Sequence, residues 1–200
     1  MHILGAGGHA KVIIDILKIN NIKISGIWDD NDDSKGFNEL LINGKIADLD
    51  SGEASVLIAI GSNQVRKLIA DEFNFKFGIA VHPSSVISSS AELKEGTVVM
   101  PNVAVNASSF IGKHVILNTG CVVDHNCKIG DYAHISPQVG LTGGVEVGEG
   151  TNIGVSACVI PGVKIGKWAT IGAGTVVIYD VPDYAVVVGN PGRIIKYNPI

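Results

Sequence analysis

A six-residue repeat runs through the second half of this 200-residue chain and restricts its fold more than any other feature. Every sixth residue from Val81 to Val177 is Ile, Leu or Val, and a small, β-branched or Cys residue follows four positions later, as at Ala133 and Thr151. A period of six fits neither the 3.6-residue period of a helix nor an ordinary meander of β-hairpins. The pattern therefore predicts a hexapeptide parallel β-helix, in which each hexad forms one short flat face and one corner.

The repeat also predicts which residues meet in space. If three hexads complete one triangular coil, residues eighteen apart stack in adjacent coils, which pair through their backbones at a spacing of about 4.8 Å. The aliphatic residue of each hexad then points into the prism, and the small residue fits the tight space near the corner. The hexads are uninterrupted from 81 to 181, so we expect no long loop to leave the prism.

The first eighty residues follow a different pattern. The segment "HILGAGGHAKVIIDIL" reads as a strand, a glycine turn and a helix with apolar residues at helical spacing. The predicted elements are strands at 3–4, 23–30 and 55–63, a helix after the glycine turn 5–8, and a helix over 64–73. Together they predict a small α/β sheet, about half a Rossmann unit. We therefore expect two domains, 1–80 and 81–200, the second ending in a C-terminal tail.

Composition excludes several classes of function. The chain is 46% hydrophobic and 17% charged, which is typical of a compact soluble protein, and its net charge of −4 gives no electrostatic argument for binding nucleic acid or anionic membranes. No apolar run approaches the length of about 18–20 residues that a membrane helix needs, and no signal peptide is recognisable. Cys121, Cys127 and Cys158 lack zinc-type spacing, so we expect buried reduced thiols and a cytoplasmic protein.

The segment "GAGGHA" matches the pattern G-x-G-x-x-A between a predicted strand and a predicted helix. Such glycines let the backbone approach a phosphate at the helix N-terminus, and Asp29 lies about twenty residues further on, where an acid can bind a ribose hydroxyl. Two plainer interpretations stay open: a tight glycine turn, and a solvated strand end at Asp29 and Asp30. An NAD(P) oxidoreductase is a further alternative, but the unit is short for a dinucleotide. A mononucleotide or nucleotide-sugar fits better.

Three histidines lie close together in the repeat, and His125 is the candidate catalyst. Eighteen-residue stacking places it between Ala107 and Gly143, whose small size leaves room beside the imidazole. We expect Gly143 to offer a free backbone N–H to a developing oxyanion, and we expect Asn118 and His134 to lie near the same groove. The alternative is that His125 is a solvated corner residue.

A zinc site is an alternative role for the histidines, because some left-handed β-helices are carbonic anhydrases. Those enzymes carry an H-x-x-x-x-H pair and a third histidine from a neighbouring coil. Here His114, His125 and His134 are separated by eleven and nine residues, so no metal is predicted.

Taken together, several segments resemble one family: "GAGGHAKV", "IWDD", "IAIGSN", "NTGCVVDHNC", "IGDYAHI" and the terminal "GNPGR". The resemblance is to nucleotide-sugar acetyltransferases of the PglD and NeuD type, which include bacillosamine and perosamine N-acetyltransferases and sialic acid O-acetyltransferases. It covers nearly the whole chain. The resemblance implies a left-handed coil, acetyl-CoA as co-substrate, and a homotrimer with active sites between neighbouring prisms.

The resemblance also implies roles for individual residues. His125 matches the family's general base, and His134 matches a residue that contacts acetyl-CoA. The positions that match the nucleotide-sugar site are Gly7, Gly8, His9, Asp29, Asp30, Gly61 and Gln64, and those that line the coenzyme groove are Val155 and Ala173. In the bacillosamine enzymes a Glu follows the catalytic histidine, whereas this chain has Asn126. Asp124 is the alternative carboxylate, so the group that orients His125 stays open.

These observations predict an acetyl-CoA-dependent N-acetyltransferase of bacterial glycan synthesis. Its expected acceptor is the 4-amino group of a nucleotide-linked amino-deoxy sugar, of the UDP-4-amino-4,6-dideoxy-N-acetylglucosamine type, with direct transfer and His125 as general base. Two alternatives stay open: a sialic acid O-acetyltransferase, and a non-catalytic trimeric scaffold that binds nucleotide-sugars.

Overall fold

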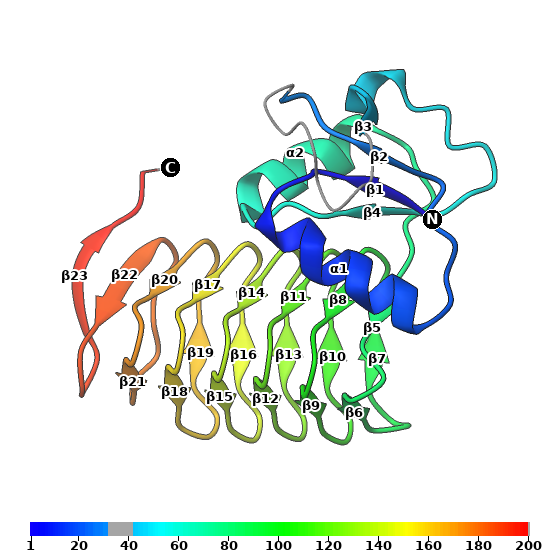
Figure 1. The fold of residues 1–200 in the computed structure, drawn as a ribbon. Helices are drawn as coiled ribbons and strands as arrows, with labels where there is room; N and C mark the ends of the chain where they lie inside the picture. The colour runs from blue at the N-terminus through cyan, green and yellow to red at the C-terminus, as the bar shows by residue number, and fades with distance from the viewer. Residues whose placement is uncertain (32–41, 200) are drawn as a thin grey trace.

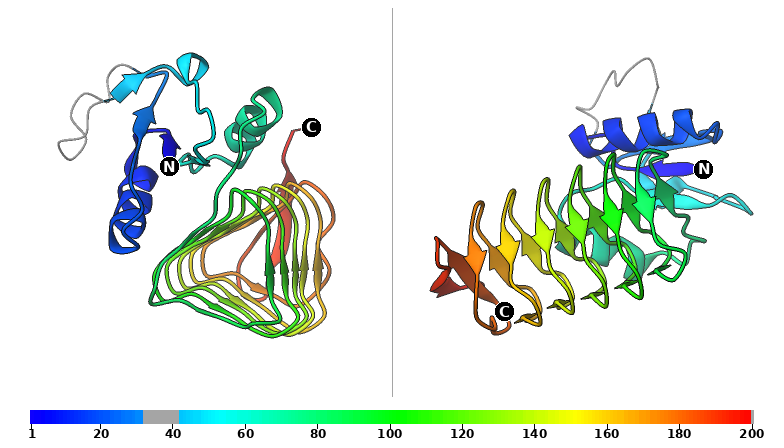
Figure 2. Two further views of the ribbon diagram at one scale, coloured as in Figure 1. Left: turned by 90° about the vertical axis from the view of Figure 1, so that its right-hand side faces the viewer. Right: turned by 90° about the horizontal axis from the view of Figure 1, so that it is seen from below.

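The computed structural model describes residues 1–31 and 42–199. A small α/β unit at the N-terminus lies along one side of a long triangular prism built by the rest of the chain (Figure 1). Viewed along the prism axis, the coils superimpose as nested triangles (Figure 2).

The N-terminal unit is a four-stranded parallel sheet with the strand order β3-β2-β1-β4. Its strands are β1 (His2–Leu4), β2 (Gly26–Trp28), β3 (Ile42–Gly44) and β4 (Val56–Ile58), and its helices are α1 (Gly8–Ile19) and α2 (Asn63–Glu72), with a 3₁₀ turn at Ile46–Asp48. The predicted helices and strands are confirmed, although the strands are shorter than expected. The sequence did not predict β3, since one apolar residue, Ile42, gives no periodic signal.

Helix α1 forms because its apolar residues recur every three or four positions. Ala10, Ile13, Ile14 and Leu17 are buried, and they pack against the sheet and the first coils of the prism. At the end of α1, Asn20 Nδ2 donates a hydrogen bond to the Val81 carbonyl at 2.8 Å. Helix α1 therefore joins the two parts of the molecule.

The prism is a left-handed parallel β-helix with three faces, as the family resemblance implied. The covered face, which lies against the N-terminal unit, consists of β5 (Ala80–Val81), β8 (Val98–Val99), β11 (Ile116–Leu117), β14 (His134–Ile135), β17 (Asn152–Ile153), β20 (Thr170–Ile171), β22 (Ala185–Val188) and β23 (Arg193–Tyr197). The apolar face consists of β6 (Val86–Ile87), β9 (Ala104–Val105), β12 (Val122–Val123), β15 (Gly140–Leu141), β18 (Cys158–Val159) and β21 (Val176–Val177). The charged face consists of β7 (Glu92–Leu93), β10 (Phe110–Ile111), β13 (Lys128–Ile129), β16 (Glu146–Val147) and β19 (Lys164–Ile165).

The aliphatic residues of the repeat form the prism core, as predicted. Each of them, from Val81 to Val177, is the second residue of its short strand and points inward. From Val99 onward none is more than 4% exposed. The first three are half-buried because no earlier coil covers them. Residues eighteen apart pair directly, for example Leu117 with Ile135, which confirms the stacking.

Buried hydroxyls and left-handed corners complete each coil. Thr97 Oγ1 donates to the Gly112 carbonyl at 2.8 Å and accepts from the Val115 N–H of the next coil at 3.2 Å. The hydroxyls of Ser109 and Thr151 make equivalent bonds. Every sixth residue from Gly96 to Gly174 has a positive φ, which turns the chain at each corner.

The outward residues differ between the faces. Those of the apolar face are Val86, Ala104, Val122, Gly140, Cys158 and Val176. The prediction of three buried thiols is wrong for Cys158, which is exposed, whereas Cys121 and Cys127 are buried. The reason is position in the hexad: Cys158 is the outward residue of β18, and the other two occupy the inward corner position.

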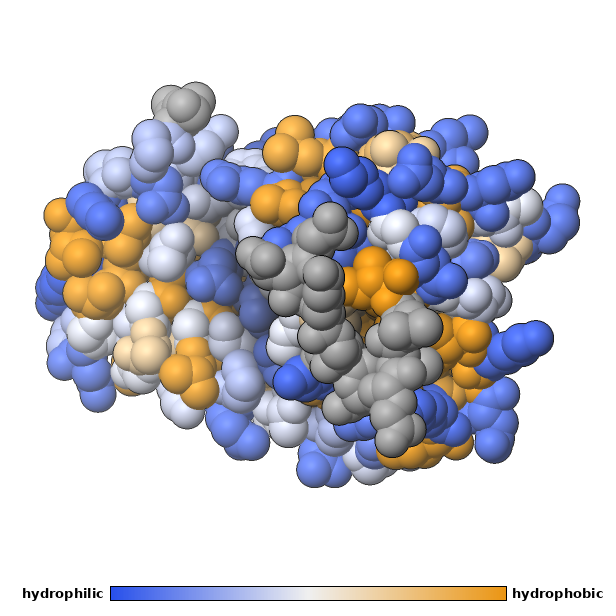
Figure 3. Space-filling view, turned by 45° about the horizontal axis from the view of Figure 1, so that its top comes forward, coloured by the Kyte–Doolittle hydropathy of each residue, from blue (hydrophilic) through white to orange (hydrophobic). Residues whose placement is uncertain are grey.

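The C-terminal tail forms an antiparallel hairpin, β22–β23. Val188, Ile194 and Ile195 are exposed on it, and apolar side chains gather over this end of the molecule (Figure 3). Within residues 1–31 and 42–199, neither α1 nor α2 has the length and apolar character required to cross a lipid bilayer.

Candidate active site

His125 lies at the corner between the apolar and charged faces, and its side chain is 60% exposed. The stacking prediction holds at this point, because a Cβ built on Gly143 would lie 2.5 Å from His125 Cε1 and 2.7 Å from Nε2. The imidazole therefore occupies the space that a side chain at position 143 would take. This explains why the position directly above His125 is glycine.

Asn126 orients the imidazole. Its side-chain Oδ1 lies 2.9 Å from His125 Nδ1, and because an amide oxygen can only accept, Nδ1 carries the proton. His125 Nε2 is then left with its lone pair. Asn126 has a φ of 61°, a conformation that asparagine tolerates better than most residues. The same residue therefore turns the corner and fixes the tautomer.

Asp124 lies on the other side of the ring. Its Oδ1 accepts from Asn106 Nδ2 and from the His125 N–H, each at 2.8 Å. The Asn106 bond, followed by the His125 N–H, lowers the pKa of the Asp124 carboxyl and keeps it ionised. Asp124 Oδ2 is 3.9 Å from His125 Nε2, too far for a hydrogen bond but close enough to stabilise a positive charge on the ring. Asn106 was not predicted, although it lies eighteen residues before Asp124 and stacking arithmetic would find it.

The expected free N–H at Gly143 stays a prediction. The Gly143 N–H is the smallest of the contributions that lower the pKa of the Asp124 carboxyl, so it lies near that carboxylate. What the structure shows of Gly143 is the space that it leaves beside His125.

His134 and Asn118 lie together, but away from His125. His134 is on the covered face, where Asn118 Nδ2 donates to His134 Nε2 at 3.0 Å. His125 lies on a different corner of the prism. Within a single subunit, therefore, Asn118 contacts His134, and neither residue lies beside His125.

Burial keeps two histidines of this region neutral. Burial first, and the positive charge of Arg66 second, lower the pKa of His134 and of His9 from 6.5 to about 4. His9 Nε2 is buried without a hydrogen-bond partner in the described part of the chain. Both imidazoles are thus available to hydrogen bond as neutral groups.

The glycines of the N-terminal unit fall into two kinds. Gly5 has a φ of 102°, and a Cβ there would lie 2.7 Å from Ile60 Cγ1, so packing and backbone geometry both require glycine. A Cβ at Gly7, Gly8 or Gly61 would meet nothing within 4 Å. The tight-turn interpretation thus accounts for Gly5. At the other three positions glycine leaves open space at the N-termini of α1 and α2, where backbone N–H groups attract a phosphate.

Asp29 and Asp30 both have structural partners. Asp29 Oδ2 accepts from the Ala6 N–H at 2.6 Å, and its Oδ1 accepts from the Asn31 N–H at 2.8 Å. Asp30 Oδ1 accepts from the Ile46 N–H at 2.9 Å. Asp29 therefore holds the glycine turn in shape, whatever further contact it makes with a ligand.

A groove of about 970 Å³ runs between α2 and the covered face. Residues that line it include Gly61, Gln64 and His134, with Trp168 and Asn198 farther along the prism. It therefore joins positions assigned from sequence to the nucleotide-sugar with one assigned to acetyl-CoA.

The two predicted coenzyme residues follow one another along the corner between the covered and apolar faces. Val155 and Ala173 are both exposed, and the Gly174 N–H donates to the Val155 carbonyl at 2.8 Å, as expected for adjacent coils. They form part of an exposed strip running up the prism.

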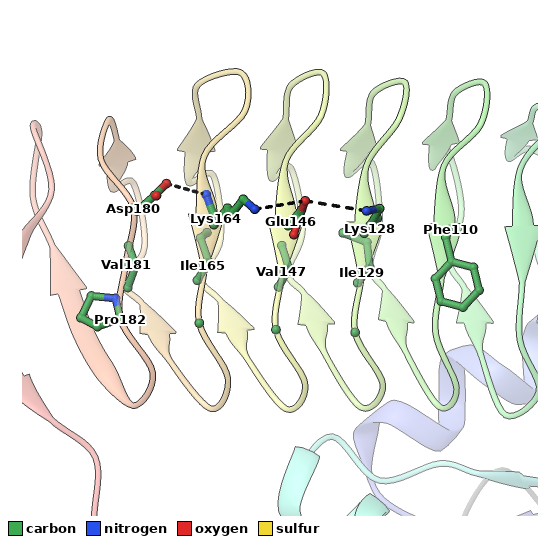
Figure 4. A pocket seen from close by; sticks show the side chains of 13 residues that line it. Phe110, Lys128, Ile129, Glu146, Val147, Lys164, Ile165, Asp180, Val181 and Pro182 are labelled. Carbon is green, nitrogen blue, oxygen red and sulfur yellow. Dashed lines mark hydrogen bonds and ion pairs between the residues drawn. The ribbon is translucent and has the colours of Figure 1, made fainter.

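A second groove, of about 660 Å³, lies on the charged face (Figure 4). Glu146 bridges Lys128 and Lys164 there, with Nζ to Oε1 distances of 3.8 and 3.6 Å. This second groove is lined by none of the site residues predicted from the sequence. Among the residues that the structure describes, no three His, Cys, Asp or Glu side chains are grouped to hold a metal ion.

Two protein families match this chain. Residues 1–73 match the family described as PglD N-terminal domain, and residues 108–143 match bacterial transferase hexapeptide repeats. Among curated proteins, the chain is 38% identical over 107 residues to UDP-N-acetylbacillosamine N-acetyltransferase of Bacillus subtilis, covering 49% of this chain and 50% of that protein. A further match, to an uncharacterised mimivirus protein, covers 21% of that protein. The chain thus spans half or less of the curated relatives it matches.

Solved structures match over nearly the whole chain. A histidine mutant of perosamine N-acetyltransferase from Caulobacter crescentus, in complex with CoA and GDP-perosamine, is 40% identical, covers 98% of this chain and 96% of its own, and has a TM-score of 0.92. The acetyltransferase domain of PglB from Neisseria gonorrhoeae, in complex with acetyl coenzyme A, is 33% identical, covers 97% and 98%, and has a TM-score of 0.90.

Proposed function

The chain belongs to the nucleotide-sugar N-acetyltransferases that join a PglD N-terminal domain to a left-handed β-helix, and on this premise we propose that it transfers an acetyl group from acetyl-CoA to a nucleotide-linked 4-amino sugar. The N-terminal domain, which we assign to residues 1–80, binds the nucleotide-sugar through Gly7, Gly8, His9 and the loop at Gly61 and Gln64. The prism, residues 81–200, binds acetyl-CoA.

The observation that carries the proposal is the state of His125. Its Nδ1 donates to Asn126, and its Nε2 keeps a lone pair in the space left by Gly143. A fixed tautomer with an exposed accepting nitrogen is what a general base requires. A merely solvated corner histidine needs neither the glycine above it nor the hydrogen bond beside it.

The proposed mechanism is direct transfer. The sugar amine attacks the thioester carbonyl carbon, a C–N bond forms, and His125 Nε2 takes a proton from the nitrogen, which typically accelerates such a step by about 10²–10⁴-fold. The Asp124 carboxylate stabilises the resulting imidazolium. The C–S bond then breaks, and the CoA thiolate leaves and takes the proton from the His125 imidazolium, which restores the neutral base. Burial raises the pKa of the Cys121 thiol to about 12, so this residue does not supply a thiolate for an acyl-enzyme.

We also propose that the active enzyme is a homotrimer assembled through the apolar face. Val86 and Val122 are exposed there at 72% and 41%, and the outward residues of this face are uncharged. The face lies between the corner that carries His125 and the corner that carries Asn118, Val155 and Ala173. Contact between such faces brings His125 of one subunit toward the coenzyme strip of the next, which accounts for their separation within one chain.

The test is an acetyl-CoA consumption assay with a panel of 4-amino sugars linked to UDP, GDP and dTDP. The UDP-linked sugar predicted from the sequence is the first acceptor to test. The GDP-linked sugar is the second, because the perosamine relative binds GDP-perosamine. Release of CoA with at least one 4-amino sugar, and an N-acetylated product by mass spectrometry, is expected. No transfer to any of them would refute the proposal.

A further inference from the structure

Among the residues that the structure describes, Arg66 is the largest side chain that is completely buried. It is 1% exposed, and it lies in the first turns of α2, directly after the loop at Gly61. Burial lowers the pKa of its guanidinium from 12.5 to about 9. An arginine in such a place requires a reason, because a buried charge that is replaced by a well-packed apolar side chain often leaves a protein equally or more stable.

Every nitrogen of this guanidinium has a carbonyl partner. Nη1 donates to the carbonyls of Ile60 and Gly61 at 3.2 and 2.9 Å. Nε donates to the His114 carbonyl at 3.1 Å, and Nη2 donates to the Tyr132 carbonyl at 2.8 Å. The last bond of Nη2 is to Asn63 Oδ1 at 3.0 Å. In the part of the chain that the structure describes, these partners are all carbonyl oxygens and none is a carboxylate.

These partners belong to two different parts of the molecule. Ile60 and Gly61 form the loop between β4 and α2, whereas His114 and Tyr132 are corner residues of two successive coils. Asn63 extends the link to a third coil, because its Nδ2 donates to the Gly150 carbonyl at 3.0 Å. The planar fork of arginine suits such multiple bonding, and the single ammonium of lysine does not reach all of these carbonyls.

We propose that Arg66 is a positioning residue, which fixes the acceptor-binding loop relative to the groove in which the acetyl group is transferred. The inference rests on the proposed function, since it takes the loop at Gly61 to hold the nucleotide-sugar and His134 to hold acetyl-CoA. Tyr132, whose carbonyl Arg66 binds, lies two residues before His134. The guanidinium thus ties the two binding elements together by a chain of short contacts.

A second effect of the same charge supports the inference. Arg66 contributes, after burial, to the lowered pKa of both His9 and His134. These two histidines come from the N-terminal unit and from the prism respectively. A positive charge placed between them therefore helps to keep both neutral as hydrogen-bonding groups.

The test compares Arg66→Met and Arg66→Lys with Ile69→Ala, a change in the same helix at a core residue that is 8% exposed. The Ile69 variant weakens the N-terminal core without touching the carbonyl contacts. At saturating concentrations of both substrates we expect kcat of the Arg66 variants to fall about 10²-fold, since a misplacement of about 1 Å has an effect of that size. KM for acetyl-CoA should stay within twofold, and Ile69→Ala should keep its kcat. An equal loss of kcat in Ile69→Ala, or normal kcat in the folded Arg66 variants, would overturn the proposal.

Amide hydrogen exchange provides a readout that does not depend on activity. Arg66→Met should accelerate exchange at the Val65 amide, which donates to the Ser62 hydroxyl at 3.4 Å, by at least about tenfold. The reason is that the hydrogen bonds that hold the loop are lost, and exchange in the prism core should stay unchanged. Unchanged exchange in the loop would contradict the positioning role whether or not acetyl transfer is observed. If the wild-type protein transfers no acetyl group while loop exchange responds as expected, the proposed function fails and the structural link stands.

Discussion

Gly143→Ala is a test of the site that leaves His125 in place. A methyl at this position would lie 2.5 Å from His125 Cε1 and 2.7 Å from Nε2, whereas nonbonded carbon atoms prefer about 3.5–4.0 Å. The ring must therefore move by about 1 Å or more. Because Gly143 does not have a positive φ, the backbone accepts alanine.

The expected result is a loss of activity without a loss of stability. The His125 side chain is 60% exposed, so it can swing into solvent, and we expect the free energy of unfolding to change by less than about 1 kcal/mol. Displacement of the base by about 1 Å should lower kcat for acetyl transfer by about 10²-fold. The assay is CoA release at saturating acetyl-CoA and acceptor, with stability followed by urea unfolding.

A double-mutant cycle supplies the control. If Gly143→Ala acts through the imidazole, it should have little further effect in a His125→Ala background. The reasoning would be refuted by full activity of Gly143→Ala, or by an equal proportional loss of kcat in both backgrounds.

Three further predictions concern orientation, pH and assembly. Asn126→Gly keeps the positive φ of the corner but removes the acceptor for His125 Nδ1, so kcat should fall by up to about tenfold with unchanged thermal stability; an unaltered kcat would contradict the orienting role. Burial lowers the pKa of His9, His114 and His134 to about 4, below the value of 6.5 in the unfolded chain. As the pH falls, the unfolded state therefore binds protons at these histidines before the folded state does. The free energy of unfolding should decline as the pH falls from 6.5 toward 4. Each histidine contributes up to about 3 kcal/mol of that loss, and urea unfolding with no pH dependence in this range would refute it. Val122→Lys on the apolar face should convert the trimer to monomer by light scattering and abolish transfer, whereas Phe110→Lys on the charged face should leave the assembly intact; a trimeric Val122 variant would rule out this interface.

Much of the prism could be predicted because its information is local and periodic. The position of each aliphatic residue in its hexad decides that it points inward, and the eighteen-residue step places Gly143 beside His125. The same rule would have found Asn106 and would have placed Cys158 on the outside. Left-handedness was implied by the family resemblance and not by the period.

The periodic pattern does not predict contacts between elements that are distant along the chain. Arg66 reads as one charged residue on an amphipathic helix, and nothing in its neighbourhood indicates that it binds carbonyls near residues 114 and 132. The separation of His134 from His125, by contrast, follows from the hexad register, because position 134 is an outward strand residue and position 125 is a corner residue of a different edge.

The most direct test of the account measures acetyl transfer to a nucleotide-linked 4-amino sugar by the wild-type protein and by His125→Ala across a range of pH. The account predicts an N-acetylated sugar from the wild-type protein and a kcat about 10²–10⁴-fold lower for a variant that remains folded. Wild-type turnover by His125→Ala would contradict it.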